Sequence, residues 1–241
     1  PGKTDVNVIW AGSDDGVVHV TRDGGKTWTD VTPKDMPEFG RVSIIDASAL
    51  DAGTAYMAVK KPLLEDFAPY LYRTHDFGRT WTKIVSGIPA GDYTHAIRED
   101  HAQRGLLYAG TQHGFYVSLD DGDHWQPLKN GLPDTPIHDI WVEANDVAIA
   151  THGRGFYILD DVQPLRQFAA APRTTDVYLF KPGEAVRNAY PAKITYWLKK
   201  QPQKLTLDIL DTSGAVVRTF EGALPPKPGG PGRSGGTGGS D

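Results

Sequence analysis

One eight-residue pattern, Ser/Thr-x-Asp-x-Gly-x-x-Trp, returns three times in this chain and limits what it can fold into. The copies are TRDGGKTW (Thr21–Trp28), THDFGRTW (Thr74–Trp81) and SLDDGDHW (Ser118–Trp125). The aspartates of successive copies are 53 and 44 residues apart. Repeats at such a period are typical of stacked or circular architectures, in which one supersecondary unit buries its apolar face only against its neighbours. The chain is therefore predicted to consist of repeated, mutually dependent units.

A degenerate fourth copy follows the third. GFYILDD (Gly155–Asp161) aligns with GFYVSLD (Gly114–Asp120) and keeps an aspartate 41 residues after Asp120, but it lacks the hydroxyl, the glycine and the tryptophan. A period of roughly 40–50 residues is the length of one four-stranded propeller blade. We therefore expect an all-β chain that begins with about four blades.

Runs of β-branched and aromatic residues around each copy predict its strands. Val8–Gly12 and Val17–Thr21 accompany the first motif, separated by an Asp-Gly turn that favours a hairpin. The same pair of runs recurs at Leu106–Gly110 with Phe115–Ser118, and at Val147–Thr151 with Phe156–Leu159. A short strand is expected after each motif tryptophan, and the innermost strands of the blades are expected at Arg41–Ser48, Tyr93–Asp100 and Ile137–Glu143.

Each residue type in the motif suits a tight turn between two strands. The aspartate and the hydroxyl accept hydrogen bonds from turn amides, and glycine takes a positive φ that a Cβ would penalise. The tryptophan is expected to bury its ring between sheets and to donate its indole N–H to a carbonyl. Three near-identical copies favour a structural role over a catalytic one. We assign that role to Thr21, Asp23, Gly25, Trp28, Thr74, Asp76, Gly78, Trp81, Ser118, Asp120, Gly122 and Trp125.

The motif resembles the Asp-box, or BNR, repeat of sialidases, sortilin-type receptors and xyloglucanases. Three segments also resemble the last blades of large secreted bacterial proteins labelled sortilin-like or BNR-repeat glycosyl hydrolase-like: Pro69–Trp81, Arg98–Trp125 and Ala150–Gln167. The resemblance covers Val6–Phe168 and implies an Asp-box propeller in a bacterial protein that is secreted or periplasmic. It does not define an activity, because one fold serves many functions.

Composition changes after the blades predict four regions. Blades occupy residues 1–168, an Ala/Pro/Thr linker 169–176, a partial immunoglobulin-like β-sandwich 177–224, and a disordered Gly/Pro-rich tail 225–241. The strands of the sandwich are expected at Lys193–Lys200, Lys204–Asp211 and Ala215–Gly222. Because the first blade lacks an innermost strand and the sandwich is short, we expect an open arc of a larger ring. The rest of its own polypeptide or a second chain would complete that ring.

Composition also limits the classes of partner. The net charge is −5 and no basic stripe stands out, so nucleic acid is not expected to bind. The sequence has no apolar run of the ~18 residues that a membrane span needs, and its lack of cysteine removes disulfides and thiol nucleophiles. The DDGD stretch at Asp120–Asp123 lacks the closing bidentate acid of a calcium loop. No zinc spacing or phosphate-cradling glycine loop is present, so we expect neither a metal nor a cofactor.

Five residues are candidates for binding a ligand. His152 and Arg154 lie in an HGRG turn between two strands, where Arg154 could clamp a carboxylate. Alternatively, Arg154 pairs with an aspartate of a neighbouring blade and His152 packs beneath it. His113 occupies the matching turn of the preceding blade, and His95 and His138 begin expected inner strands.

Asp139 is the catalytic candidate, because a histidine next to a carboxylate could act as an acid or base. However, adjacent residues on a strand point to opposite sides, so His138 and Asp139 do not easily face one ligand.

Two functions from different classes remain open. The first is a non-catalytic scaffold that binds a peptide or a glycan. The second is part of a glycoside hydrolase of the xyloglucanase type, in which two carboxylates flank the scissile bond about 5–10 Å apart. An open, aromatic-lined groove with two facing acids would favour the enzyme. We expect instead a narrow or arc-like surface without a carboxylate pair.

Overall fold

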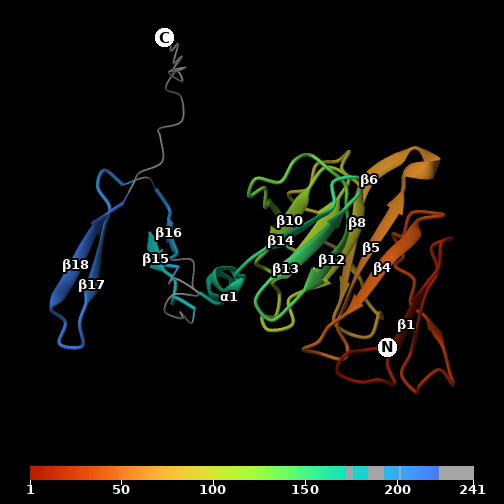
Figure 1. Ribbon diagram of the computed structural model, residues 1–241. Coiled ribbons are helices and arrows are strands. Elements are labelled where there is room, and N and C mark those ends of the chain that lie inside the picture. The colour runs from red at the N-terminus through yellow and green to blue at the C-terminus, as the bar shows by residue number, and fades with distance from the viewer. Residues whose placement is uncertain (172–175, 184–192, 201, 223–241) are drawn as a thin grey trace, which may run out of the picture. The chain divides into compact units, whose positions relative to one another are not determined.

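The computed structural model describes residues 1–171, 176–183, 193–200 and 202–222 (Figure 1). The chain divides into two compact units. One comprises Pro1–Arg173 with Gly183–Ala192, and the other comprises Thr174–Pro182 with Lys193–Asp241. Residues 172–175 of the expected linker and the whole expected tail, 225–241, lie outside the described residues.

The first unit contains four antiparallel sheets whose strands follow one another in sequence order, which we call blades 1 to 4. Blade 1 has β1 (Ile9–Gly12), β2 (Val18–Thr21) and β3 (Thr29–Asp30). Blade 2 has β4 (Arg41–Ala47), β5 (Ala55–Lys61), β6 (Asp66–Thr74) and β7 (Thr82–Lys83). Blade 3 has β8 (Thr94–Glu99), β9 (Leu107–Thr111), β10 (Phe115–Ser118) and β11 (Gln126–Pro127). Blade 4 has β12 (Ile137–Val142), β13 (Val147–Thr151) and β14 (Phe156–Leu159).

The expected strands are confirmed. The strands expected to be innermost are β4, β8 and β12, and each forms one edge of its sheet. Strand β8 contacts β4 of blade 2 and β12 of blade 4, so these edges lie side by side across consecutive blades (Figure 1). The short strands after the tryptophans are β3, β7 and β11.

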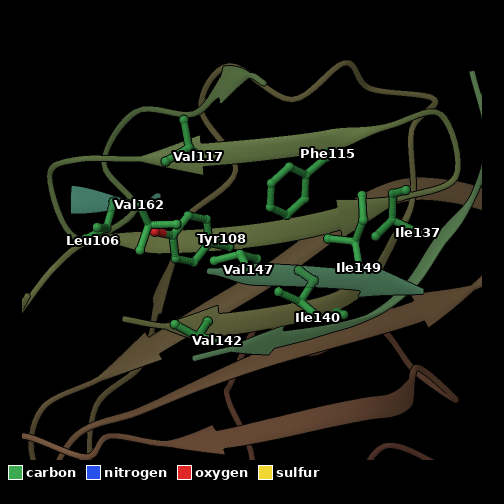
Figure 2. Close-up of a cluster of buried hydrophobic side chains, with 11 residues drawn as sticks. Leu106, Tyr108, Phe115, Val117, Ile137, Ile140, Val142, Val147, Ile149 and Val162 are labelled. Atoms are coloured by element: carbon green, nitrogen blue, oxygen red, sulfur yellow. The ribbon is translucent and has the colours of Figure 1, made fainter. Parts of the chain in front are cut away.

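The blades are held together by apolar side chains that alternate along the strands and meet between neighbouring sheets. Figure 2 shows the cluster between blades 3 and 4, where Phe115 and Val117 of β10 lie above Ile140 of β12 and Ile149 of β13. A second cluster joins blades 2 and 3, and a third joins blades 1 and 2. Blade 3 is therefore covered on both faces, as the mutual dependence of the repeats predicts.

The three motifs form the same hydrogen-bonded turn. In the first, the Thr21 hydroxyl donates to Asp23 (2.8 Å) and accepts the Gly25 N–H (3.0 Å), while Asp23 accepts the Thr27 N–H (2.9 Å). The equivalent bonds recur in both other copies. Hydrogen bonds from the backbone and hydroxyl of Thr27 lower the pKa of Asp23 to about 2. The aspartate thus stays ionised and holds the turn closed.

Two of the three motif tryptophans form a hydrogen bond with the preceding blade. The Trp81 indole donates to the Val31 carbonyl (2.7 Å) and the Trp125 indole to the Ile84 carbonyl (2.8 Å). Trp28 differs from the expectation of a buried ring, because 45% of it is exposed whereas Trp125 is 3% exposed. The reason is positional: among the described residues, no sheet packs on the Trp28 side of blade 1.

A helix that the sequence did not predict, α1 (Gln163–Ala170), follows blade 4. It covers the end of the region expected to be blades and the start of the expected linker. Arg166 anchors it, because its Nε donates to both carboxylate oxygens of the buried Asp100 (2.9 and 3.0 Å). Its guanidinium also donates to the Glu143 and Ala144 carbonyls.

Within its described residues, the second unit contains two antiparallel strand pairs. Strand β15 (Val177–Leu179) pairs with β16 (Tyr196–Leu198), and β17 (Thr206–Leu210) pairs with β18 (Val216–Glu221). Strands β16, β17 and β18 fall within the three runs expected from the sequence. The immunoglobulin-like sandwich and the region boundaries stay predictions.

Candidate functional site

A groove of about 650 Å³ opens where the inner strands of the blades begin. We call it the basic groove. It is lined by Asp14, Phe39, Arg41, Lys60, Lys61, Pro62, Leu63, Leu64, Tyr93, His95 and His138. One wall comes from blade 2, in which β5 and β6 are longer than their counterparts and are joined by the 3₁₀ turn η1 (Pro62–Leu64). Glu65 then takes a left-handed conformation that ends the turn.

Aromatic rings from three blades form a continuous row at this groove. The ring centroids are 5.0 Å apart for Tyr93 and His95, 4.3 Å for His95 and His138, and 5.0 Å for His138 and His152. Phe67 of β6 extends the row, 6.1 Å from Tyr93. The structure therefore brings together three of the five predicted binding residues: His95, His138 and His152.

Backbone bulges place two of these histidines. The register between β8 and β9 shifts from Thr94 to Ala96, and the register between β12 and β13 shifts from Ile137 to Asp139. His95 and His138 are the residues inside these shifts, where an extra residue re-aims its side chain. A similar shift in blade 2 contains Ser43, whose hydroxyl donates to the His95 carbonyl (2.7 Å). Equivalent shifts in blades 3 and 4 thus place two rings of the row.

Hydrogen bonds hold His95 as a neutral ring. The Lys60 Nζ lies 3.2 Å from its Nδ1, and the Gln112 Oε1 lies 3.2 Å from its Nε2. Since an ammonium only donates, Nδ1 accepts and Nε2 carries the proton. Burial lowers the pKa of His95 to about 4, and the positive charges of Lys60, His138 and His152 act in the same direction.

The same environment lowers the pKa of two further groups. Burial lowers the pKa of His138, with further contributions from Lys60 and His152. Burial and the Arg41 charge lower the pKa of Lys60. The lining contains three cationic side chains and one acid, Asp14, in a chain whose net charge is −5. The groove is therefore locally basic, which the overall composition conceals.

The remaining two binding candidates, His113 and Arg154, lie outside the ring row and, like His152, are not among the residues that line the groove. His113 Nδ1 is 3.0 Å from Asp134 Oδ1, and its backbone N–H donates to Asp92 (2.9 Å). Arg154 is exposed, and its backbone N–H donates to Thr151 Oγ1 (3.1 Å). Within the described residues the Arg154 guanidinium forms no ion pair, so the expected pairing with an aspartate of a neighbouring blade is not seen there.

The catalytic candidate Asp139 does not act with its neighbour. Its carboxylate accepts the Arg98 Nη2–H (2.9 Å), whereas the His138 ring lies between the rings of His95 and His152. The two side chains therefore have different partners and form no acid–base pair.

Two carboxylates share a pocket elsewhere, whereas we expected a surface without a carboxylate pair. In a pocket of about 360 Å³ on the side of the motifs, the Tyr56 hydroxyl lies 3.2 Å from Glu99 and 2.6 Å from Asp121. Burial raises the pKa of Glu99. Asp121 is also paired with Arg73 (3.1 Å) and contacts His75 (2.8 Å). Both carboxylates are thus committed to a network that joins blades 2 and 3.

Sequence reasoning missed most of the groove lining, including Arg41, Lys60, Leu63 and Leu64. The available signal was the segment KKPLLEDF, Lys60–Phe67, which replaces the short turns TQHG and HGRG of the other blades. No cluster of three or more metal-ligating side chains occurs in the described part of the chain. Its helices are also too short or too polar to cross a bilayer.

The architecture defines a class: the first unit consists of β-propeller blades, and the described chain is all-β apart from η1 and α1. No family model and no curated protein matches the sequence. Solved structures do match. "YCF48 bound to D1 peptide" has a TM-score of 0.50 and 18% identity over 66% of this chain and 50% of that one.

Two glycoside hydrolase structures are also similar. The GH74 enzyme of Niastella koreensis has a TM-score of 0.52 and 14% identity over 77% of this chain and 31% of that one. The GH74 xyloglucanase of Xanthomonas campestris has a TM-score of 0.51 and 18% identity over 89% of this chain and 31% of that one. At such identities the likeness shows the fold alone. The chain spans half or less of each of these structures.

Proposed function

We propose that this chain is a non-catalytic propeller segment that binds a peptide in the basic groove. The observation that carries the proposal is the exposed apolar wall beside the ring row. Leu63 is 91% exposed, Phe39 60% and Leu64 56%. Large apolar side chains gathered at a concave surface mark a binding site, and nearby polar groups orient the ligand. The peptide-bound propeller among the similar structures has the same fold, which makes this use of the fold feasible.

The alternative is part of a glycoside hydrolase acting on polysaccharide. The Glu99 and Asp121 carboxylates favour it, because each contacts Tyr56 in one pocket. Two features argue against it. Glu99 is only 2% exposed, and the basic groove, which is the larger hollow, has a single acidic lining residue. The aliphatic wall also suits peptide side chains better than sugar hydroxyls.

We further propose that the three motifs are Asp-box repeats of the sortilin-like, BNR-repeat type, in a bacterial protein that is secreted or periplasmic. The identical hydrogen-bonded turns support the Asp-box assignment, whereas the proposed location rests on the resemblance of the sequence.

The blades are also proposed to belong to a larger ring, completed by the rest of the polypeptide or by a second chain. Repeat-equivalent positions support this: Phe115 and Val117 are 4% and 6% exposed beneath blade 4, whereas Phe156 and Ile158 on blade 4 are 79% and 63% exposed.

A peptide array tests the binding function. The purified chain is incubated with an array of random-sequence 12-residue peptides and, in parallel, with xyloglucan oligosaccharides. We expect a subset of peptides to bind, and L63S/L64S to abolish that binding. The control is I158S, which removes another exposed apolar side chain, from blade 4 and outside the groove. Binding of oligosaccharide alone, or peptide binding that L63S/L64S leaves intact, would contradict the proposal.

A further inference from the structure

The basic groove contains cations that the protein itself does not neutralise. Among the described residues, no carboxylate lies within ion-pair distance of Arg41, Lys60 or Lys61. Asp14 lines the groove but forms no ion pair in that part of the chain either. Partly buried charge without a counter-ion is unfavourable. The groove therefore favours binding of a negatively charged group of a ligand.

Lys60 is the cation best placed to contact such a group. It is half-buried at the end of β5, and its Nζ is bonded to the Nδ1 of the buried His95. An ammonium has three N–H donors, so two remain for a ligand. The Gln112 amide fixes the other nitrogen of His95, which holds the ring and through it the ammonium. The site is preorganised rather than assembled from flexible surface lysines.

The apolar wall lies immediately next to these charges in the chain. Lys60 and Lys61 end β5, and the exposed Leu63 and Leu64 follow on η1. A ligand that uses both features carries an anionic group and an apolar group within a few ångströms of each other. Neutral sugars would leave the cations without a partner, and acidic polysaccharides would leave the leucines uncovered. A peptide with a carboxylate beside an apolar side chain satisfies both.

We infer that the basic groove selects peptides by a carboxylate, which binds at Lys60 with Arg41 and Lys61 nearby, while an adjacent apolar side chain packs on Leu63 and Leu64. This inference rests on the proposed function and adds the class of ligand. The lowered pKa values of Lys60 and His138 agree with it: burial is the main cause of both, and neighbouring positive charge, which an anion would offset, lowers them further. The carboxylate is either an Asp or Glu side chain or the C-terminus of the peptide.

The test compares matched peptides. Each peptide that binds on the array is synthesised in three forms: as found, with Asp and Glu replaced by Asn and Gln, and with a C-terminal amide. We expect one of the two neutralised forms to lose affinity roughly fivefold or more, since one close charge pair near a surface is worth about 1 kcal/mol or more. Which form loses affinity identifies the source of the carboxylate.

The variant K60M removes the charge and keeps the length of the side chain. It should bind the acidic and the neutralised peptides equally, because their difference arises at Lys60. The control K26M removes an exposed lysine from the motif turn of blade 1 and should keep the difference. Thermal melts of both variants show whether each is folded.

The outcomes separate the two proposals. If peptides bind but the charged and neutralised forms bind alike, the inference is wrong and the peptide-binding function stands. If the xyloglucan oligosaccharides of the array experiment bind and no peptide does, both are wrong. A K60M protein that is folded and still prefers the acidic peptide also overturns the inference.

Discussion

Two of the three motif glycines, Gly78 and Gly122, pack against the preceding blade, which leads to a sharp stability prediction. Gly25 and Gly122 occupy the same motif position and have positive φ angles of 95° and 90°. A Cβ added at Gly122 would lie 2.5 Å from Ile84 Cδ1, whereas a Cβ at Gly25 would meet no atom within 4 Å. The substitutions G25A and G122A therefore share the same backbone strain and differ only in the clash with blade 2.

The magnitudes follow from these two contributions. A Cβ at positive φ costs about 1–2 kcal/mol, and we expect this alone for G25A. Overpacking a tight core site costs a further ~1–3 kcal/mol, so the free energy of unfolding of G122A should fall by this amount as well. The variant I84V removes the atom that clashes, and the next contact of the added Cβ, with Ile84 Cβ, is 3.1 Å. The double variant G122A/I84V should therefore be more stable than the sum of the two single changes predicts.

Urea unfolding of the four variants and the parent protein measures these differences. If G25A and G122A lowered the free energy of unfolding equally, or if the two single changes were strictly additive in the double variant, the close approach of the blades at this position would be refuted.

Three further predictions concern other parts of the molecule. Replacing Arg166 with leucine should destabilise the fold by about 3–5 kcal/mol, because it leaves the buried Asp100 carboxylate unpaired; urea unfolding checks this. The change W81F should cost about 1 kcal/mol by removing the indole hydrogen bond to the preceding blade, while W28F, at the exposed equivalent, should be nearly neutral in the same assay. Peptide affinity should rise as the pH falls from about 7.5 to about 5.5. In the free protein, burial and neighbouring cations lower the pKa of His138, and a bound carboxylate should raise that pKa again. The complex would then bind more protons than the free protein, so lower pH favours binding. Fluorescence polarisation across this range measures the trend, and an unchanged affinity would contradict it.

The repeat made most of the strands predictable from sequence, because each blade applies the same alternation and the same turn residues. The three motifs predict their own hydrogen bonds, since an aspartate, a glycine and a hydroxyl at fixed spacing leave few other arrangements of the turn. Trp28 was the exception. Its motif is intact, yet burial of the ring depends on a neighbouring sheet rather than on the motif.

The candidate site was only partly predictable, for two physical reasons. His95, His138 and His152 were identified one by one, but they meet through bulges and through packing between blades, which sequence spacing does not encode. The wall formed by Leu63 and Leu64 belongs to an enlarged hairpin that only blade 2 has, so the repeat gave no template for it. Helix α1 was missed because Arg166 stabilises it through a distant partner.

The most direct test of peptide binding in the basic groove is an NMR spectrum of the imidazole nitrogens. The chain has eight histidines, of which His95 and His138 line the groove. Adding an acidic peptide found on the array to the ¹⁵N-histidine-labelled protein should shift the resonances of these two rings. The resonance of His113, which pairs with Asp134 outside the groove, should stay in place. Saturable binding with no change at His95 and His138, or with the largest change at His113, would show that the peptide binds elsewhere and would contradict the account.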